Sequence, residues 1–200
     1  MAIWERFRKS SDWRFVGIHL GLVILLQAIG EEYFRYERDW LSSGELWRII
    51  TSHWVHVGWM HMFLNTLGLA VCVGLATPNW SIRRWFIQCL CMALGISILF
   101  TLQNPDLNWY VGFSGVLFGL YFLAAHDLYA RDRLIALLMG GAIVVKVILE
   151  QYTSFDLDTS GIIGAPVIVD AHLYGLLMAI AIALVWSTYT MNHGPTEQSN

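Results

Sequence analysis

Val111-Gly112-Phe113-Ser114-Gly115-Val116-Leu117-Phe118-Gly119 opens the apolar run around which the rest of this 200-residue sequence is organised. The stretch sets a serine between two glycines, among side chains that are almost all hydrocarbon. If Ser114 begins a helix, free backbone N–H groups and the positive end of the helix dipole lie beside its hydroxyl. We therefore predict that Ser114 is a nucleophile, and that the other apolar runs build the environment in which it works.

The composition indicates an integral membrane protein. The sequence is 56% hydrophobic and 14% charged, with a mean hydropathy of +0.54, whereas soluble domains usually carry about 25% charged residues. The net charge of −3 is too small to indicate a partner, and nothing in the sequence indicates nucleic-acid binding. All three cysteines lie inside apolar runs, so we expect them to be small buried hydrophobes.

Six apolar runs predict an all-α membrane protein with six transmembrane helices. The runs are 15–30 and about 57–77, 85–102, 114–130, 134–152 and 166–189. We place this six-helix domain at 15–190, after a basic amphipathic segment at 1–14 and before a short polar tail at 191–200. Residues 31–55 are polar and aromatic, which predicts a structured loop at the membrane interface rather than a span.

The first run has a second interpretation as a cleaved signal peptide, because a basic segment precedes it and Ala28-Ile29-Gly30 ends it. We favour a retained first helix, since a membrane protein needs no cleaved signal. The placement of Lys and Arg then gives the orientation. With the N-terminus inside, the inner segments hold most of these residues, and the loops at 103–112 and 153–165 hold none. Both termini are expected inside, with the second, fourth and sixth helices running inward.

Three polar residues fall at one predicted depth in the membrane. His61, Ser114 and His172 each lie 17 positions before the expected inner end of their helix, which is Pro78, Arg131 and Tyr189 respectively. At 1.5 Å per residue each sits roughly 25 Å above the inner boundary. In a hydrocarbon core of about 30 Å, all three then lie just below the outer surface. Polar side chains in a bilayer are costly, so we treat them as functional candidates.

The helix faces favour a meeting of these residues. Two helices carry pairs of small residues spaced by four, which let membrane helices approach closely. These pairs are Gly115 with Gly119 on the fourth helix, and Ala171 with Gly175 on the sixth. Ordinary helix packing would also explain them, and both interpretations can hold. Close approach would bring Ser114 and His172 within hydrogen-bonding reach, about 2.6–3.2 Å.

Roles at the site follow from the chemistry of the residue types. A serine hydroxyl is a weak nucleophile until a base takes its proton, and we predict His172 as that base. His61 and Asn65 are four apart on one helix face, where they can donate to an oxyanion together with the backbone at Ser114. Asp170 lies two residues from His172, on nearly the opposite side of the helix. No acid therefore completes a triad, and we predict a Ser–His dyad.

Other polar residues have plainer explanations. Lys146 and Glu150 are four apart on the fifth helix, which favours an intramembrane ion pair, with shaping of a substrate gate as the alternative. Several histidines and Asp170 suggest a metal site at first sight, but the sequence holds no His-Glu-x-x-His helix. We expect no metal and no cofactor.

The motifs together resemble the rhomboid family of intramembrane serine proteases. They are Trp47-Arg48, His56-x4-His61-x3-Asn65, Gly112-Phe113-Ser114-Gly115 and Ala171-His172-x2-Gly175, in the family order over about residues 47–180. The resemblance implies a six-helix rhomboid-like bundle, with 31–55 as a half-buried first loop and the fifth helix with the following loop as a substrate gate. It also implies the same roles for Ser114, His172, His61 and Asn65. Phe118 departs from the pattern, because the family often has a tyrosine packed on the catalytic histidine.

The short six-helix form and the sequences around Ser114 and His172 resemble the rhombosortase branch. That branch implies bacterial membrane-anchored substrates with a C-terminal Gly-Gly motif, a transmembrane helix and a basic tail. The expected location is the bacterial inner membrane, with the site opening to the periplasmic side. A non-catalytic rhomboid-like binder of transmembrane helices is the alternative; such proteins lose the serine or the histidine, and this chain has both. A transporter is disfavoured, because no internal repeat is evident. The sequence does not give the oligomeric state.

Overall fold

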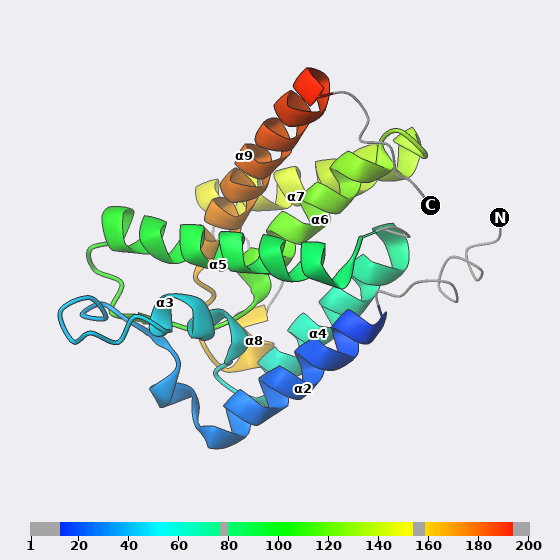
Figure 1. Cartoon of the computed structure of the whole chain (residues 1–200). Coiled ribbons are helices and arrows are strands. Elements are labelled where there is room, and N and C mark those ends of the chain that lie inside the picture. The colour runs from blue at the N-terminus through cyan, green and yellow to red at the C-terminus, as the bar shows by residue number, and fades with distance from the viewer. Residues whose placement is uncertain (1–12, 77–79, 154–158, 194–200) are drawn as a thin grey trace.

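The computed structural model describes residues 13–76, 80–153 and 159–193, and these form a bundle of helices with a structured loop at one end (Figure 1). The predicted basic segment at 1–14 and the polar tail at 191–200 therefore lie largely outside the described residues. The elements in chain order are α2 (Trp13–Ile29), η1 (Glu31–Tyr33), β1 (Tyr36–Glu37), α3 (Arg48–Thr51), η2 (Ser52–Trp54), α4 (Trp59–Ala76), α5 (Ile82–Gln103), β2 (Trp109–Tyr110), α6 (Ser114–Leu128), α7 (Arg133–Tyr152), α8 (Thr159–Ile163) and α9 (Val169–His193).

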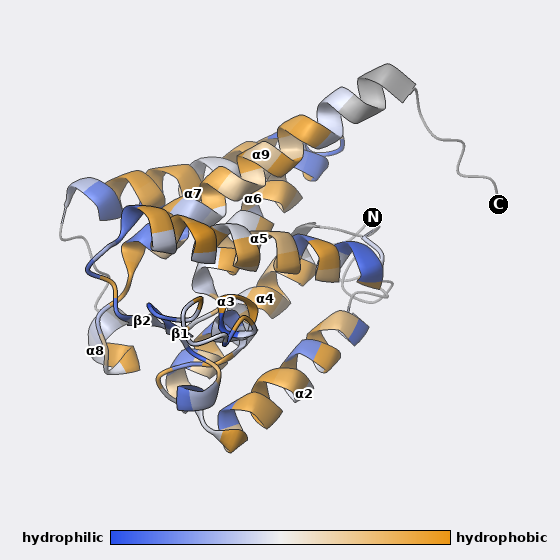
Figure 2. Ribbon diagram, turned by 60° about the vertical axis from the view of Figure 1, so that its left-hand side comes forward, coloured by the Kyte–Doolittle hydropathy of each residue, from blue (hydrophilic) through white to orange (hydrophobic). Residues whose placement is uncertain are grey.

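A helix stands at each of the six predicted apolar runs, but the count of six spans is not established by length and composition. Among the described residues, α5, α7 and α9 are long and apolar enough to cross a membrane. The helical segments 48–54 and 59–74 meet at a bend of 87°, and they make a fourth candidate span if the two are counted as a single membrane crossing. The other two helices are shorter: α2 has 17 residues and α6 has 15. Figure 2 shows hydrophobic residues along the long helices and hydrophilic ones at their ends and in the loops.

The short helix α6 is the centre of the bundle. It is packed by α4, α5, α7 and α9, and most of its side chains are buried. Because protein rather than lipid surrounds α6, its length does not have to match the thickness of the bilayer. Its nearest neighbour is α9, which runs alongside it (Figure 1).

The predicted small-residue pairs lie at the contact between α6 and α9. A Cβ atom added at Gly115 would come within 2.6 Å of the carbonyl oxygen of Ala171, and one added at Gly119 within 2.7 Å of the carbonyl oxygen of Gly175. A Cβ at Gly175 would overlap the carbonyl of Gly115. These obstacles are backbone atoms, which cannot rotate away as a side chain can. The close approach predicted from the spacing is confirmed, and it requires glycine.

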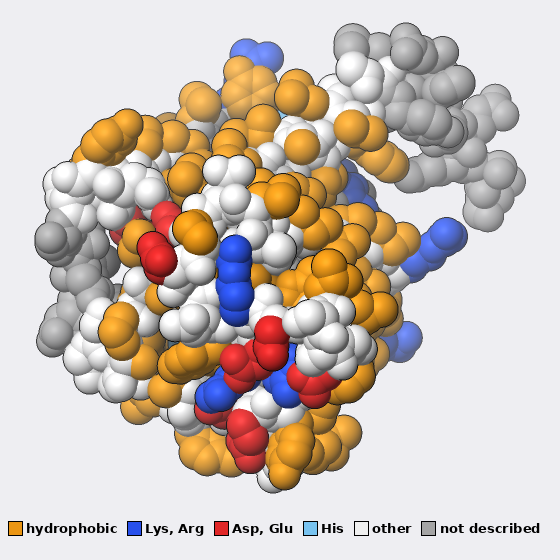
Figure 3. All heavy atoms as spheres, turned by 90° about the vertical axis from the view of Figure 1, so that its left-hand side faces the viewer, with side chains coloured by type: hydrophobic (Ala, Val, Ile, Leu, Met, Phe, Trp, Pro, Cys, Tyr) orange, Lys and Arg blue, Asp and Glu red, His pale blue; other side chains and the backbone are white. Residues whose placement is uncertain are grey.

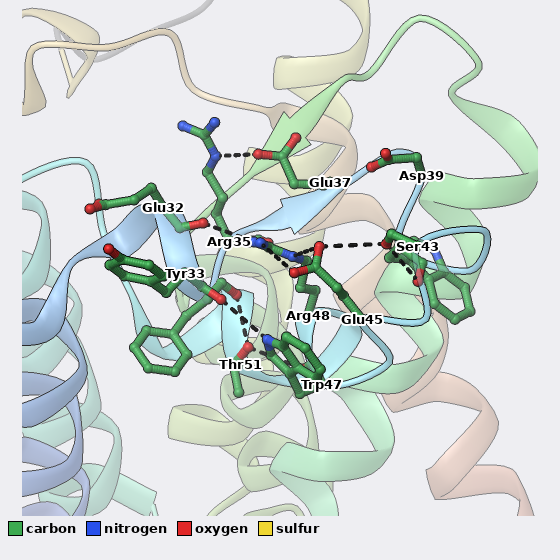
Figure 4. Close-up of polar contacts among 12 residues, drawn as sticks. Glu32, Tyr33, Arg35, Glu37, Asp39, Ser43, Glu45, Trp47, Arg48 and Thr51 are labelled. Atoms are coloured by element: carbon green, nitrogen blue, oxygen red, sulfur yellow. Dashed lines mark hydrogen bonds and ion pairs between the residues drawn. The ribbon is translucent and has the colours of Figure 1, made fainter.

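The loop between α2 and α4 is ordered by backbone carbonyls that accept hydrogen bonds from one guanidinium. β1 pairs antiparallel with β2, which follows α5 in the chain. The buried Arg48 donates to the carbonyls of Glu32 and Arg35, 2.9 Å each, and pairs with Glu45 at 2.8 Å (Figure 4). The hydrogen bond that Arg48 donates to Glu45 holds the pKa of the Glu45 carboxyl below its ordinary value. The predicted structured loop is therefore present, and it folds around Arg48.

A second arginine ties the loop to the bundle. The guanidinium of Arg38 donates to the carbonyls of Phe100, Thr101 and Asn104, at 3.0 Å each. These carbonyls belong to the last turn of α5 and its cap, where intrahelical partners run out. Figure 3 views this side of the molecule, where acidic and basic side chains gather among hydrophobic ones. The loop thus caps one end of the apolar bundle with paired charges.

Replacing Gly175 by alanine should destabilise the protein by about 1–3 kcal/mol, because the new methyl group forces α6 and α9 apart. The measurement is thermal or denaturant unfolding of the purified protein in detergent. Gly141→Ala is the matched control, since Gly141 lies in α7 with nothing within 4 Å of an added Cβ. There the higher helix propensity of alanine should leave the stability equal or slightly raised. Equal stability of Gly175→Ala and the wild type would contradict the requirement for glycine.

Candidate active site

Four residues proposed from the sequence line one cavity of about 680 Å³: Ser114, His172, His61 and Asn65. They come from three helices that begin at the same end of the bundle. Ser114 is the first residue of α6, while His61 and His172 lie in the first turns of α4 and α9. Residues that are far apart in sequence therefore converge because their helices run in the same direction.

Ser114 and His172 are in direct contact. The Oγ atom of Ser114 lies 3.0 Å from Nε2 of His172. The imidazole is buried, and the ring of Phe118 stacks on it with centroids 4.1 Å apart and planes 2° apart. Phe118 therefore provides the stacking expected of the tyrosine that it replaces. The predicted contact between the Ser114 hydroxyl and the His172 imidazole is therefore present.

The imidazole has a further partner that the sequence analysis did not assign. Oε2 of Glu150, near the end of α7, lies 2.8 Å from Nδ1 of His172. Lys146 pairs with the other oxygen of the same carboxylate, so the predicted ion pair on α7 is also present. The sequence analysis found no acid to complete a triad with His172, whereas the structure places this carboxylate at hydrogen-bonding distance from the imidazole. Asp170 does point away, with its carboxylate 2.5 Å from the amide nitrogen of Asn104.

A signal for Glu150 was available in the sequence. Depth counting from the inner ends of the other helices gave 17 positions for Ser114, His61 and His172. Glu150 lies 17 positions after Arg133, at the inner end of the fifth helix. The same arithmetic would have put its carboxylate at the level of the site.

His61 and Asn65 form one wall of the cavity. The Asn65 amide donates to the carbonyl oxygen of His61 at 3.0 Å, which fixes the orientation of its carboxamide. The ring of His61 lies beneath Gly112, where an added Cβ would be 2.8 Å from its Cε1 atom. Both side chains thus line the same cavity as Ser114.

The backbone before Ser114 is held in a conformation that only glycine adopts readily. Gly112 has φ +127°, its N–H donates to the carbonyl of Ser52 at 3.0 Å, and its carbonyl accepts from the Tyr110 hydroxyl at 2.8 Å. Burial raises the pKa of the Tyr110 phenol, so it remains a neutral donor. The turn leaves the first N–H groups of α6 beside the Ser114 hydroxyl without intrahelical partners.

A second serine–histidine pair, Ser97 with His53, differs from Ser114 with His172 in its hydrogen bonding and its position. Oγ of Ser97 lies 3.1 Å from Nε2 of His53, but its proton is donated to the carbonyl of Ile49 at 2.8 Å. The histidine must then donate to the serine rather than accept from it. Both residues are fully buried and neither lines the cavity. Ser97 is therefore a structural serine.

The described part of the chain contains no group of three or more His, Cys, Asp or Glu residues arranged to hold a metal ion. The remaining buried histidines have apolar or aromatic neighbours. His19 lies 4.4 Å from the ring of Phe113, and His56 lies edge-on to His61 at 4.9 Å. The backbone of His56 is held by a pair of hydrogen bonds to the side chain of Gln27.

Comparisons with known proteins give the family of the chain. A family model described as "Rhomboid domain" matches residues 43–189. The chain is 23% identical over 175 residues to Rhomboid protease GluP of Bacillus subtilis, covering 82% of this chain and 34% of that protein. It is 31% identical over 79 residues to Rhomboid-like protease 5 of Toxoplasma gondii, covering 40% and 9%. It is 33% identical over 88 residues to RHOMBOID-like protein 5 of Arabidopsis thaliana, covering 42% and 28%. The chain thus spans about a third or less of the length of these relatives.

Gly112→Ala should destabilise the protein by more than Gly44→Ala. Both positions have positive φ, which costs a non-glycine residue roughly 1–2 kcal/mol. Only at Gly112 would the added methyl group also press on His61, since nothing lies within 4 Å of an added Cβ at Gly44. Unfolding in detergent measures both changes, and the excess at Gly112 reports the crowding. Equal losses would mean that His61 does not pack against this turn.

Proposed function

The chain belongs to the rhomboid family, and we propose that it is an intramembrane serine protease that uses Ser114 as nucleophile and His172 as general base. The observation that carries the proposal is the 3.0 Å contact between the Ser114 hydroxyl and Nε2 of His172, inside a cavity of an integral membrane protein. A base at hydrogen-bonding distance can take the hydroxyl proton as oxygen attacks a peptide carbonyl. The imidazolium then returns the proton to the leaving amine.

The tetrahedral intermediate carries an oxyanion that needs donors. The first N–H groups of an α-helix lack intrahelical partners, and the positive end of the helix dipole lies beside them. We therefore propose the N–H of Ser114, at the start of α6, as a backbone donor to the oxyanion. His61 and Asn65 line the same cavity and are proposed as side-chain donors. Donors that are already in place before reaction cost no reorganisation in the transition state.

The proposed substrates are membrane-anchored proteins, cut within a transmembrane or C-terminal anchor segment near the outer face of the bacterial inner membrane. The proposed topology has six spans with both termini in the cytoplasm, so that the cavity opens to the periplasmic side. The sequences around Ser114 and His172 resemble those of the rhombosortase branch, which supports a preference for substrates with Gly-Gly C-terminal tails. The lipid bilayer surrounds the proposed helix bundle. The proposed hydrolysis by serine and histidine needs no cofactor.

A fluorophosphonate that reacts with activated serines should label the wild-type protein in detergent. Ser114→Ala should abolish the label, because the nucleophile is removed, and His172→Ala should reduce the labelling rate by about 10²-fold or more. Ser97→Ala is the matched control and should label like the wild type, since that serine is buried beside its own histidine. Label that persists in Ser114→Ala would contradict Ser114 as the nucleophile. Folded wild-type protein that does not label would favour a non-catalytic binder of transmembrane helices.

Co-expression should distinguish the substrate class. A reporter with a Gly-Gly motif, a transmembrane helix and a basic tail should be cut by the wild type and left intact by Ser114→Ala. Mass spectrometry of the new C-terminus then gives the cleaved bond. Cleavage of a generic transmembrane reporter, with no cleavage of the Gly-Gly reporter, would contradict the rhombosortase-like preference while leaving protease activity in place.

A further inference from the structure

A continuous chain of polar contacts runs through the site from α7 to α6. Lys146 pairs with one oxygen of Glu150, the other oxygen lies 2.8 Å from Nδ1 of His172, and Nε2 of that ring lies 3.0 Å from Ser114. Every strong hydrogen-bonding atom of the imidazole is therefore engaged. The four residues lie on three helices: Lys146 and Glu150 on α7, His172 on α9 and Ser114 on α6.

The two ring nitrogens must have different roles. A carboxylate accepts hydrogen bonds and cannot donate, so Nδ1 carries the hydrogen and donates to Glu150. Nε2 is then the lone-pair nitrogen, free to accept the hydroxyl proton of Ser114. Lys146 places a counter-charge against the other oxygen of this carboxylate. Glu150 thereby selects the tautomer that a general base requires.

Burial makes this contact strong. The side chains of Glu150 and His172 are 4% and 5% exposed, so little water competes with them or screens them. When Ser114 loses its proton to Nε2, an imidazolium forms between the stacked ring of Phe118 and the carboxylate. A buried cation without a nearby counter-charge is costly, and Glu150 is already in contact with it.

Given the proposed protease function, on which this rests, we propose that Glu150 is a positioning residue that completes a Ser114–His172–Glu150 triad. It holds the imidazole in the active tautomer and stabilises the imidazolium, and Lys146 holds Glu150 in turn. The Ser114 proton moves to Nε2 while the Nδ1 hydrogen stays on the ring, so no proton passes to the carboxylate.

The position of Glu150 on α7 has a consequence for the assembly of the site. α7 is the least buried of the three long apolar helices, with 17% of its apolar stretch buried against 44% and 39% for α5 and α9. Glu150 is one of its few buried side chains, together with Ala136 and Val147. Glu150 therefore holds the His172 imidazole only while the end of α7 that carries Glu150 is packed against α9.

The test compares two substitutions of Glu150, one that keeps the size of the side chain and one that keeps its charge. Glu150→Gln keeps the size and loses the charge, while Glu150→Asp keeps the charge and is one methylene shorter. With the cleaved reporter, Glu150→Gln should lower kcat by about 10²-fold with KM within a few-fold, and Glu150→Asp should retain more activity than Glu150→Gln. The labelling rate with the fluorophosphonate should follow the same order. Unfolding temperatures establish that both variants are folded.

Asp132→Asn is the matched control. It makes the same carboxylate-to-amide change at the other end of α7, where Asp132 caps the helix by accepting from the N–H of Ile135 at 3.2 Å. Asparagine caps equally well, so kcat should equal that of the wild type.

A purely structural role reverses the expected order: Glu150→Gln would then match the wild type and Glu150→Asp would be the weaker variant. That order, or a wild-type kcat in Glu150→Gln, overturns the triad and leaves the serine protease intact. Failure of the wild type to label or cleave would instead overturn the proposed function.

Discussion

The close approach of α6 and α9 is the constraint on which the site depends. Gly115 and Gly175 bring the two backbones so near that a single added methyl group would overlap a carbonyl. Serine has a short side chain, so Ser114 reaches His172 only because the helices touch at this level. In a membrane, where lipid is as apolar as leucine, such tight packing of small residues is a principal source of helix association. Stability and site geometry therefore rest on the same glycines.

The second constraint is that buried charged groups in a low-dielectric environment need partners. In the described part of the chain, the buried charged side chains are Arg48 and Glu150, and each is partnered. Arg48 folds the first loop around two carbonyls and Glu45, and Glu150 joins Lys146 to the imidazole of His172. Arg48 thus orders the loop at one end of the bundle, and Glu150 contacts the imidazole that lines the cavity.

Much of the site was predictable because depth in a membrane is nearly one-dimensional. Counting residues from the inner ends placed Ser114, His61 and His172 at one level, and the structure brings all three to one cavity. Spacing by four predicted the shared face of His61 and Asn65. Glu150 was missed because the pattern within α7 already explained it as the partner of Lys146. Contact between helices depends on rotation about each helix axis, which depth does not give.

The sequence by itself determined the membrane environment, the positions of the helices and the residue types that could perform acyl transfer, because hydropathy and 3.6-residue periodicity are local properties. Only the tertiary structure decided that α6 is a short central helix enclosed by protein, that the first loop folds around Arg48, and that a carboxylate from α7 meets the imidazole of His172 on α9. These features depend on which helix faces meet. That choice is made by packing over the whole bundle, and no single stretch of sequence records it.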